Sequence, residues 1–260
     1  MYNVERKIEI IKSLEKDGRV SAAELAKRFG TSKETIRRDL CELEEKGVLK
    51  RTHGGAMLSN KLSDMDSLVR EYPESVRGIR NSEEKKALCK KAASFIQDGD
   101  IIFIDNSTTC LYLIQNIPAE YHVTILTNSL RLLTEAVNYD CTNKTFYCLG
   151  GSMNPSNLST YDSTTLSKDK MDFYPDKCIV SCMGISSERM FTDGSYYEIG
   201  TKQKFMEQSS EVYLLADHTK IGTDGQFALD SGEHIDFLIT DEKNAKKKVK
   251  LSSNIKVITA

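Results

Sequence analysis

The chain has 260 residues, a length that suits one large domain or two unequal ones. Its 36 Lys and Arg, 38 Asp and Glu and 39% hydrophobic residues are the proportions of an ordinary soluble protein. No apolar run approaches the roughly 20 residues needed to cross a bilayer, and residues 1–12 are charged and amphipathic, unlike a signal peptide, so we expect a cytoplasmic protein with no membrane partner. Seven scattered cysteines and four dispersed histidines lack the spacing of a disulfide framework or a metal site, so we expect reduced thiols, no metal and no cofactor.

Charge is distributed unevenly along the chain. Residues 1–58 carry 13 Lys and Arg and 10 Asp and Glu, a net charge of +3, which leaves 23 and 28, or −5, for the rest. A positive excess in a small N-terminal part suits contact with phosphates, whereas the acidic remainder disfavours nucleic acid. We therefore expect a small basic domain at residues 1–58, a polar linker at 59–74 and a large domain at 75–260.

The first two predicted elements are helices with one apolar face. Apolar residues at three- and four-residue spacing predict a helix over residues 4–16, which Asp17-Gly18 ends. Ser21-Ala22-Ala23-Glu24 has the pattern of a capping box, in which Ser21 accepts a hydrogen bond from a free amide and Glu24 reaches back to the cap. The second helix should therefore open there and stop at Gly30.

A third helix is predicted after only a tight turn. Thr31-Ser32-Lys33-Glu34 has the pattern of a second capping box, and Ile36, Leu40 and Leu43 form an apolar stripe. The first turns carry hydroxyls and cations that can meet phosphates and base edges in a major groove: Ser32, Lys33, Thr35, Arg37 and Arg38. Two short helices joined by such a turn are typical of a helix-turn-helix, with the third helix as its recognition helix.

A basic hairpin is predicted behind the third helix. Gly47 breaks the helix, and Gly54-Gly55 separates two short extended runs, which suits a hairpin turn. Such a hairpin is a wing, and we expect Lys50, Arg51 and His53 to flank the groove. The alternative is that the basic residues only solvate a helix. However, cations at the start of the third helix and acids at its end oppose the helix dipole, which favours an anion-binding role.

Helical and strand-like segments alternate beyond the linker, which predicts an α/β domain with a Rossmann-like, mainly parallel sheet covered by helices. The predicted strands are short apolar runs at residues 101–104, 123–126, 145–148, 178–180, 212–215, 237–239 and 255–258. The predicted helices are a capped helix at 81–97 and stretches near 108–117, 129–137, 162–170 and 196–209. Lys246-Lys247-Lys248 is interpreted as a solvated surface run.

Three polar segments come directly after predicted strands, and ligands in such folds bind beyond the carboxyl ends of the strands. Asp105-Asn106-Ser107-Thr108-Thr109 offers hydroxyls and free amides to a phosphate. Thr127-Asn128-Ser129 follows the second strand, and Gly150-Gly151-Ser152 follows the third, where glycines let a ligand approach the backbone. Each segment alone has the chemistry of an ordinary turn or cap, but the three together predict a pocket.

Several of these motifs match one known family. In the N-terminal part they are Gly18-Arg19-Val20-Ser21, the run from Thr35 to Leu40 and the run from Gly47 to Ala56. In the larger part they are Glu84-Lys85, Asp105 to Thr109, Thr127-Asn128-Ser129, Gly150-Gly151, Thr192-Asp193 with Glu198 and Lys202, and Leu215 to Gly222. With these motifs the chain resembles the DeoR family of bacterial transcription regulators, over both parts.

The resemblance implies a sensor domain similar to phosphopentose isomerases, which usually binds a phosphorylated sugar. It implies that Ser107, Thr108 and Thr109 hold the phosphate with Lys220 and Lys85. It also implies that the following residues face the sugar or shape the pocket: Asp105, Asn128, Glu198 and Lys202. The chain departs from the family pattern at Ser107, where glycine is usual, and at Met183, in a segment that is usually richer in glycine and often acidic.

The sequence therefore predicts a DNA-binding regulator, a repressor of sugar-metabolism genes that binds a double-stranded operator as a homo-oligomer (dimer or tetramer) and answers to a phosphorylated sugar. The alternatives are a phosphosugar isomerase-like enzyme and a DNA-binding protein with a degenerate ligand pocket. An isomerase needs a positioned carboxylate base. The stretch Met183-Gly184-Ile185-Ser186, where the isomerases have Asp-Gly-Ala-Asp, supplies none. Glu198 remains as a possible acid, but Met183 cannot move a proton, so we expect no catalytic residue.

Overall fold

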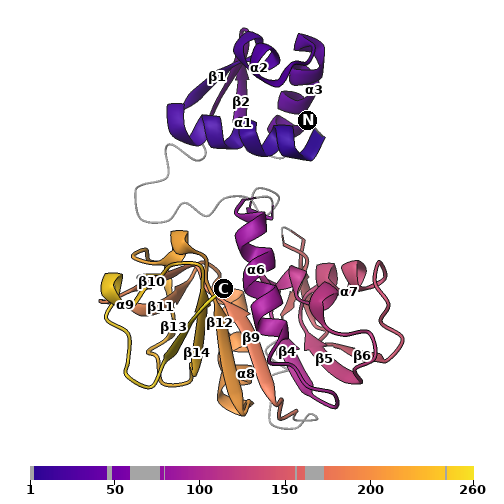
Figure 1. Ribbon diagram of the computed structural model, residues 1–260, viewed down its shortest axis with the longest axis vertical. Helices are drawn as coiled ribbons and strands as arrows, with labels where there is room; N and C mark the ends of the chain where they lie inside the picture. Colours follow the sequence, from indigo (N-terminus) through magenta and orange to yellow (C-terminus); the bar gives the residue numbers. More distant parts are fainter. Residues whose placement is uncertain are drawn as a thin grey trace. The chain divides into compact units, whose positions relative to one another are not determined.

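The computed structural model describes residues 3–45, 49–58, 77–78, 80–155, 157–161, 173–243 and 245–260. The chain divides into two compact units, Met1–Arg80 and Asn81–Ala260, which are coloured along the sequence in Figure 1. The predicted linker at residues 59–74 and the predicted helix near 162–170 lie outside the described residues. None of the described helices is long and apolar enough to span a membrane.

The N-terminal unit has the element order of a winged helix-turn-helix. Its described elements are α1 (Asn3–Asp17), β1 (Arg19–Ser21), α2 (Ala22–Phe29), α3 (Lys33–Glu45), β2 (Leu49–Thr52) and β3 (Gly55–Leu58). The strands form an antiparallel sheet in the order β1-β3-β2. α2 ends at Gly30, whose φ of 61° is the left-handed conformation that glycine favours. The predicted apolar stripe of α3 is confirmed, because Ile36, Leu40 and Leu43 are all buried.

The start of α2 differs from the predicted capping box. Ser21 occupies the cap position, but its side chain makes no capping hydrogen bond. Instead, Ser21 is the last residue of β1, and the backbone N–H of Ala22 donates to the carbonyl of Gly54 at 2.8 Å. The sheet thus satisfies an amide that the isolated helix would leave for its cap.

The turn of the hairpin lies one residue earlier than predicted. His53 and Gly54 form the two-residue turn, with Gly54 at a φ of 95°, and Gly55 is the first residue of β3, paired with both Thr52 and Ser21. A Cβ atom on Gly55 would lie 1.9 Å from the carbonyl oxygen of Val20. Glycine is therefore needed at position 55 because β1 approaches the hairpin closely, and at position 54 because of the turn.

A buried ion pair joins α1 to α3. The guanidinium of Arg6 donates to both carboxylate oxygens of Asp39, at 2.5 Å and 3.0 Å, and both side chains are at most one-tenth exposed. Hydrogen bonding to Asp39 raises the pKa of Arg6 against the opposing effect of burial. No local pattern in the sequence indicates this pair, yet its two hydrogen bonds fix α3 on α1.

The C-terminal unit is built on seven parallel strands, in agreement with the predicted fold class. They are β4 (Ile101–Ile104), β5 (Val123–Thr127), β6 (Lys144–Cys148), β9 (Lys177–Ser181), β12 (Glu211–Leu215), β14 (Phe237–Thr240) and β15 (Lys256–Thr259). Their order in the sheet is β15-β14-β12-β9-β4-β5-β6. All seven predicted strands are confirmed to within one residue or so at each end, because short apolar runs between polar turns suit strands buried on both faces.

Alternate residues of the central strands enter two apolar layers on opposite faces of the sheet. Ile102 and Ile104 of β4 pack with α6 (Ser82–Ala93) and α7 (Leu130–Ala136), whereas Phe103 packs with α8 (Tyr196–Gln208). The rings of Phe103 and Phe205 stack with centroids 4.3 Å apart. Figure 1 shows α6 lying across the sheet. The polar residues lie beyond the ends of the strands, in the loops.

Several helices differ from the prediction in length or type. α6 ends at Ala93 rather than near residue 97, and Asn81 at its start is left-handed (φ 52°) and makes no side-chain cap. The stretch at 108–117 consists of two short 3-10 turns, Cys110–Tyr112 (η1) and Ile114–Asn116 (η2). α7 is confirmed, and its cap Ser129 accepts a hydrogen bond from the amide of Leu132 at 3.1 Å.

Two small antiparallel sheets were not predicted. One contains β10 (Gly184–Ser186), β11 (Met190–Asp193) and β13 (Phe227–Asp230), and the other contains β7 (Ser152–Asn154) and β8 (Ser159–Tyr161). The remaining described elements are the 3-10 turn η3 (His218–Lys220) and α9 (Ala245–Lys248), which holds the predicted lysine run.

Substitution of Asp39 by alanine should destabilise the N-terminal unit by about 3 kcal/mol, because it removes the carboxylate that bonds the buried Arg6 guanidinium. Hydrogen exchange of α1 and α3 amides in the full chain measures this loss. Glu34→Ala is the matched control: Glu34 is exposed and lies 3.5 Å from Arg37, so its removal should change stability by no more than about 0.5 kcal/mol. Equal protection in Asp39→Ala and the parent would contradict the assigned role.

Candidate functional site

The N-terminus of α3 presents hydroxyls and cations on an exposed surface. The Oγ atom of Ser32 accepts a hydrogen bond from the amide of Thr35 at 3.0 Å and lies 2.9 Å from the Thr35 hydroxyl. Ser32 is therefore the cap, rather than Thr31 as the predicted capping box requires. The two hydroxyls lie beside the free amides of the first turn, where the positive end of the helix dipole favours an anion.

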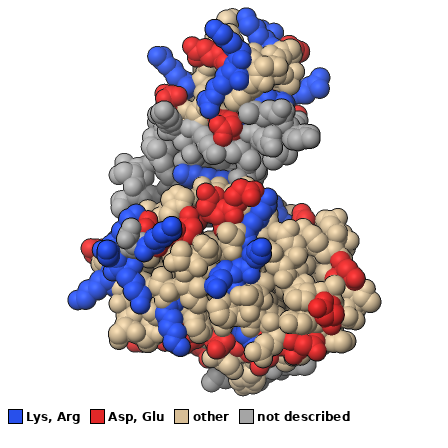
Figure 2. All heavy atoms as spheres, viewed as in Figure 1, with Lys and Arg blue, Asp and Glu red and all other residues tan. Residues whose placement is uncertain are grey.

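Three basic side chains follow on the same helix. Lys33, Arg37 and Arg38 are not buried, and Arg37 lies 3.5 Å from Glu34, an exposed and weak pair. Within the described parts of the chain, neither Lys33 nor Arg38 has an ion-pair partner. Figure 2 shows Lys and Arg side chains projecting from the N-terminal unit. These cations are therefore available to an external anion.

The hairpin of β2 and β3 borders the start of α3. A groove of about 480 Å³ lies between them and is lined by Lys33 and Arg37 from the helix and by residues 51–55 from the hairpin. The structure thus brings the predicted recognition helix and the predicted wing to one concave surface. Lys50 and His53 are exposed on the hairpin.

Arg51 has a different setting from the other predicted cations. Its backbone N–H and its guanidinium both donate to Glu44 of α3, at 2.8 Å and 2.6 Å. The hydrogen bonds from the backbone and then from the guanidinium lower the pKa of Glu44. Arg51 therefore ties the hairpin to the helix, so that a contact with an anion would have to compete with this pair.

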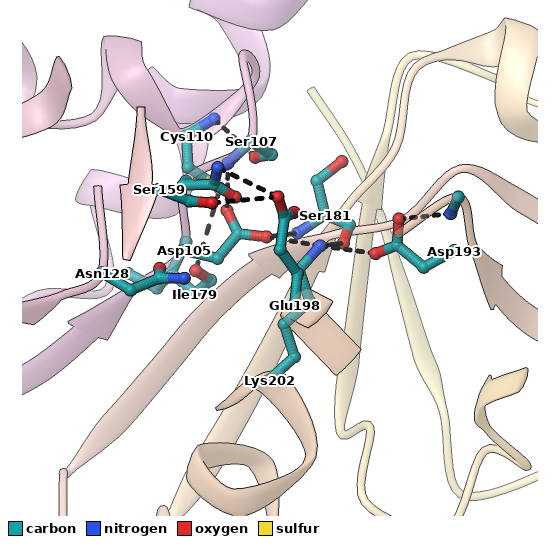
Figure 3. Close-up of polar contacts among 12 residues, drawn as sticks. Asp105, Ser107, Cys110, Asn128, Ser159, Ile179, Ser181, Asp193, Glu198 and Lys202 are labelled. Carbon is teal, nitrogen blue, oxygen red and sulfur yellow. Dashed lines mark hydrogen bonds and ion pairs between the residues drawn. The ribbon is translucent and has the colours of Figure 1, made fainter. Parts of the chain in front are cut away.

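The C-terminal unit holds a buried polar cluster where β4, β9 and β11 end (Figure 3). Asp105, one residue beyond β4, accepts hydrogen bonds from the amides of Ser107 and Ser181, both at 3.0 Å. Its carboxylate also lies 2.9 Å from the ammonium of Lys202. Burial alone would raise the pKa of Asp105, but the charge of Lys202 and these amides lower it. Asp105 is thus an ionised, fully engaged side chain.

Lys202 of α8 is the centre of this cluster. Its ammonium donates to the carbonyl of Ser181 at 2.9 Å and to Asp193 at 2.6 Å, in addition to its pair with Asp105. Burial alone would lower the pKa of Lys202, but the carboxylates of Asp105, Asp193 and Glu198 raise it well above its usual value. A protonated amine with three acceptors is a positioning group and not a nucleophile.

Glu198, one turn before Lys202 on α8, gathers donors from two other segments. Its Oε1 atom accepts hydrogen bonds from Asn106 at 3.3 Å, from Ser159 at 3.4 Å and from Asn157. Asn128, beyond β5, is joined to the same region through Thr160, whose amide donates to the Asn128 carbonyl at 2.8 Å. The structure therefore brings Asp105, Asn128, Glu198 and Lys202 into one cluster.

The predicted phosphate turn lies beside this cluster. The hydroxyl of Ser107 accepts a hydrogen bond from the amide of Cys110 at 3.2 Å, and the ammonium of Lys85 donates to the hydroxyl of Thr108 at 3.2 Å. Thr109 is buried, and its carbonyl accepts a hydrogen bond from the Cys89 thiol at 3.0 Å. Lys85 and the three hydroxyl residues thus lie together, with one ammonium directed at the turn.

Three other predicted residues lie less closely in the site. Lys220 is the last residue of η3, and no hydrogen bond or ion pair of the described residues joins its ammonium to the cluster. Its charge does act on the thiol of Cys182. Burial and the charge of Asp193 raise the pKa of this thiol to about 12, and the charge of Lys220 opposes the rise. Gly150 and Gly151 are exposed, with φ of 57° and 98°, so the turn itself accounts for both glycines.

Sequence reasoning missed four polar members of the cluster: Asn106, Asn157, Ser159 and Ser181. Asn106 stands inside the predicted polar turn, so its position after a strand could have indicated it. Asn157 and Ser159 belong to a polar stretch without periodicity, and only the fold brings them to Glu198. Asp193 lies in a motif noted from the sequence but was not assigned to the site.

The two units define a class of protein: a regulator with a winged DNA-reading module and a separate α/β domain. The family model for the DeoR-like helix-turn-helix domain matches residues 6–61, and that for the DeoR C-terminal sensor domain matches residues 80–242. The chain belongs to the DeoR family of transcription regulators.

Relatives match over nearly the whole chain. The transcriptional regulator GolR of Listeria innocua is 31% identical, covering 94% of this chain and 92% of its own. The transcriptional repressor GlcR of Bacillus subtilis is 32% identical over 93% and 89%. The lactose phosphotransferase system repressor of Staphylococcus epidermidis is 32% identical over 100% of both.

Solved structures give weaker matches. A ribose-5-phosphate isomerase is 16% identical with a TM-score of 0.39, covering 54% of this chain and 53% of its own, and the sorbitol operon regulator SorC of Klebsiella pneumoniae is 14% identical with a TM-score of 0.38, covering 94% and 98%. Likenesses of this size carry no argument about activity, so the sheet order and the family matches define the fold.

Replacement of Lys202 by methionine should destabilise the C-terminal unit by about 3–5 kcal/mol, because it leaves two buried carboxylates without their cation. Without Lys202, burial would raise the folded-state pKa of Asp105 above the unfolded value of about 3.9, so the variant should regain stability between pH 7 and pH 5. In the parent, Asp105 contributes stability above its unfolded pKa and loses it only as pH falls through its lowered folded pKa.

Urea unfolding at both pH values measures this effect. Lys86→Met is the matched control, because Lys86 pairs with the exposed Glu83 at 2.8 Å. A Lys202→Met protein as stable as the parent at pH 7, or less stable at pH 5 than at pH 7, would show that the ammonium does not hold the cluster.

Proposed function

We propose that this protein is a cytoplasmic repressor of sugar-metabolism genes that binds a double-stranded operator as a homo-oligomer and is released by a phosphorylated sugar. The observation that carries the DNA-binding part is the exposed, capped start of α3 beside the hairpin, with Lys33 and Arg38 free of acidic partners in the described residues. The names of GlcR and of the lactose phosphotransferase system repressor, both repressors, support the direction of regulation.

On this proposal α3 enters a major groove and the hairpin contacts the flanking backbone. Two copies would place their recognition helices in successive grooves, so half-sites should lie about 10 base pairs apart or a multiple of that. Ser32, Thr35 and Lys33 would meet the phosphates near the helix start, and Arg37 and Arg38 would divide base and phosphate contacts. Lys50 and His53 would add contacts from the hairpin, and Arg51 would hold it in place.

The polar cluster of the C-terminal unit is proposed as the effector site. The turn Ser107–Thr109 with Lys85 has the hydroxyls and the cation that a phosphate requires, and Lys220 would add a second cation. Asp105 and Lys202 shape the floor, and Asn128 and Glu198 face the sugar. Gly150 and Gly151 would border the site from the end of β6. Effector binding would change DNA affinity through a coupling free energy of typically about 1–3 kcal/mol.

An isomerase activity is disfavoured by the chemistry of the segment between β9 and β11. Proton transfer beside a carbonyl requires a carboxylate base within reach of the substrate. Met183 carries no titratable group, and Gly184–Ser186 forms β10. The nearby carboxylates of Asp105 and Asp193 are held by Lys202, and that of Glu198 accepts hydrogen bonds from Asn106, Asn157 and Ser159. The regulator therefore explains the site better than an enzyme does.

Substitution of Arg38 by alanine should weaken operator binding about tenfold or more, because it removes a base or phosphate contact worth about 1–3 kcal/mol. Fluorescence anisotropy with a labelled genomic operator at several salt concentrations measures both affinity and salt dependence. Arg28→Ala is the matched control, since the Arg28 guanidinium is engaged by Ser13 and Glu9 of α1. Parent-like binding by Arg38→Ala at matched salt would refute the assignment.

A phosphorylated sugar at 100 times its dissociation constant should stabilise the parent by about 2.7 kcal/mol and release the operator. Thr108→Val, which removes the hydroxyl that Lys85 contacts, should abolish both effects. Thermal-shift and operator-release assays over a panel of sugar phosphates test this, with Thr134→Val, an exposed threonine of α7, as control. A flat response over the whole panel would favour the alternative of a degenerate ligand site.

A further inference from the structure

Two carboxamide side chains of the effector cluster have an acceptor atom with nothing to accept. Asn106 is 6% exposed and Asn128 is 3% exposed. The Oδ1 atom of each is buried, and no donor within the described residues lies within hydrogen-bond distance of it. A buried acceptor without a donor destabilises a fold, so folded proteins rarely retain one unless another molecule satisfies it.

The orientation of both carboxamides is fixed by their partners. The Nδ2 atom of Asn106 donates to Glu198 at 3.3 Å, and the Nδ2 atom of Asn128 donates to the carbonyl oxygen of Thr160 at 3.3 Å. A carboxylate and a backbone carbonyl are both acceptors, so exchanging the nitrogen and oxygen of either amide would bring two acceptors together. It is therefore the oxygen of each group that is left without a partner.

The two oxygens belong to one contiguous part of the site. Asn106 and Asn128 follow β4 and β5, neighbouring parallel strands paired at Ile104 and Thr127. Asn106 reaches Glu198, Glu198 accepts from Ser159, and the next residue, Thr160, bonds to Asn128 through its amide and its carbonyl. Figure 3 shows Asn128, Ser159 and Glu198 around Asp105. The predicted phosphate turn, Ser107–Thr109, directly follows Asn106.

We propose that the side-chain oxygens of Asn106 and Asn128 accept hydrogen bonds from hydroxyl groups of the effector, which makes these two asparagines its specificity-determining residues. The inference rests on the proposed function and deepens it. The effector is then a polyhydroxylated phosphate ester, with its phosphate at the Lys85–Thr108 end and neighbouring hydroxyls at the asparagine end.

An unpaired acceptor atom makes the site selective for ligands with hydroxyl groups. A carbonyl oxygen gains nothing from an anion or from an apolar chain, but it gains a hydrogen bond from each hydroxyl it meets. A site built to bond a hydroxyl rejects an analogue that lacks it, because its own polar groups then stay buried and unpaired. Hydroxyl-free phosphate esters of the same length should therefore bind poorly.

The test compares three probes by isothermal titration of the full chain at matched ionic strength: glucitol 6-phosphate, hexyl phosphate and inorganic phosphate. Hexyl phosphate has the same six-carbon length as glucitol 6-phosphate but no free hydroxyl. With about a tenfold contribution from each hydrogen bond, glucitol 6-phosphate should bind about 100-fold more tightly than hexyl phosphate. Because this comparison uses the parent protein, it tests the proposal even if substitutions at the buried asparagines prevent folding.

Asn106→Ala and Asn128→Ala test the residues themselves. Each should weaken glucitol 6-phosphate about tenfold and leave hexyl phosphate and inorganic phosphate unchanged. Asn138→Ala is the matched control, because Asn138 is an exposed carboxamide that donates to Glu135 at 3.3 Å, just as Asn106 donates to Glu198. The control should bind all three probes as the parent does.

The outcomes separate this inference from the proposed function. If all three probes bind but the two organic phosphates bind equally, as they would if the oxygens held only water, the inference is wrong and the phosphate site stands. The same holds if the preference for glucitol 6-phosphate persists in both variants. If no probe binds, inorganic phosphate included, the proposed phosphate site fails and this inference fails with it.

Discussion

The ammonium of Lys202 is the contact on which the polar centre of the large unit depends. It lies between Asp105 from the end of β4 and Asp193 from the end of β11, and it also bonds the carbonyl of Ser181 at the end of β9. Three segments far apart in the sequence meet at this one cation. Ionised groups are stable in such a buried position only when their hydrogen bonds are complete, so the geometry of the surrounding loops is fixed by the need to surround this amine.

In the N-terminal unit, too, charged side chains bond to one another, and these pairs leave other charged side chains exposed on the surface. Asp39 of α3 is turned inward to Arg6, and Glu44 holds Arg51 of the hairpin. Two acids of the recognition helix are thereby engaged by contacts within the unit. Lys33 and Arg38 are left on the outer surface, so the charge that a duplex would meet is more positive than the composition of the helix indicates.

The strands and the first recognition-helix turns could be predicted from the sequence because local patterns determine them. Runs such as Ile101–Ile104 between polar turns have few alternatives to a buried strand, and the stripe of Ile36 and Leu40 has helical spacing. The antiparallel strands β10, β11 and β13 were missed because they are three or four residues long and because β13 pairs with β11 from a distant segment. Their stability comes from tertiary contacts that no local pattern records.

The polar turns were predicted as a site, but their internal contacts were not. The clustering of Asp105, Asn128, Glu198 and Lys202 follows from the strand order, which places β4 between β5 and β9. Two local predictions were wrong for a similar reason. Ser21 makes no capping hydrogen bond because β1 runs directly into α2. Gly55 was assigned to the turn because the sequence does not reveal its close approach to Val20.

The close approach of Gly55 to the backbone of Val20 divides the hairpin into two parts under different constraints. No side chain fits at position 55, where β3 meets β1, whereas Lys50 and His53 are exposed. Substitutions at the exposed positions therefore leave this contact between β3 and β1 intact. Proteins that share this architecture can thus differ at the exposed hairpin positions while they keep the glycine that seats the hairpin against β1.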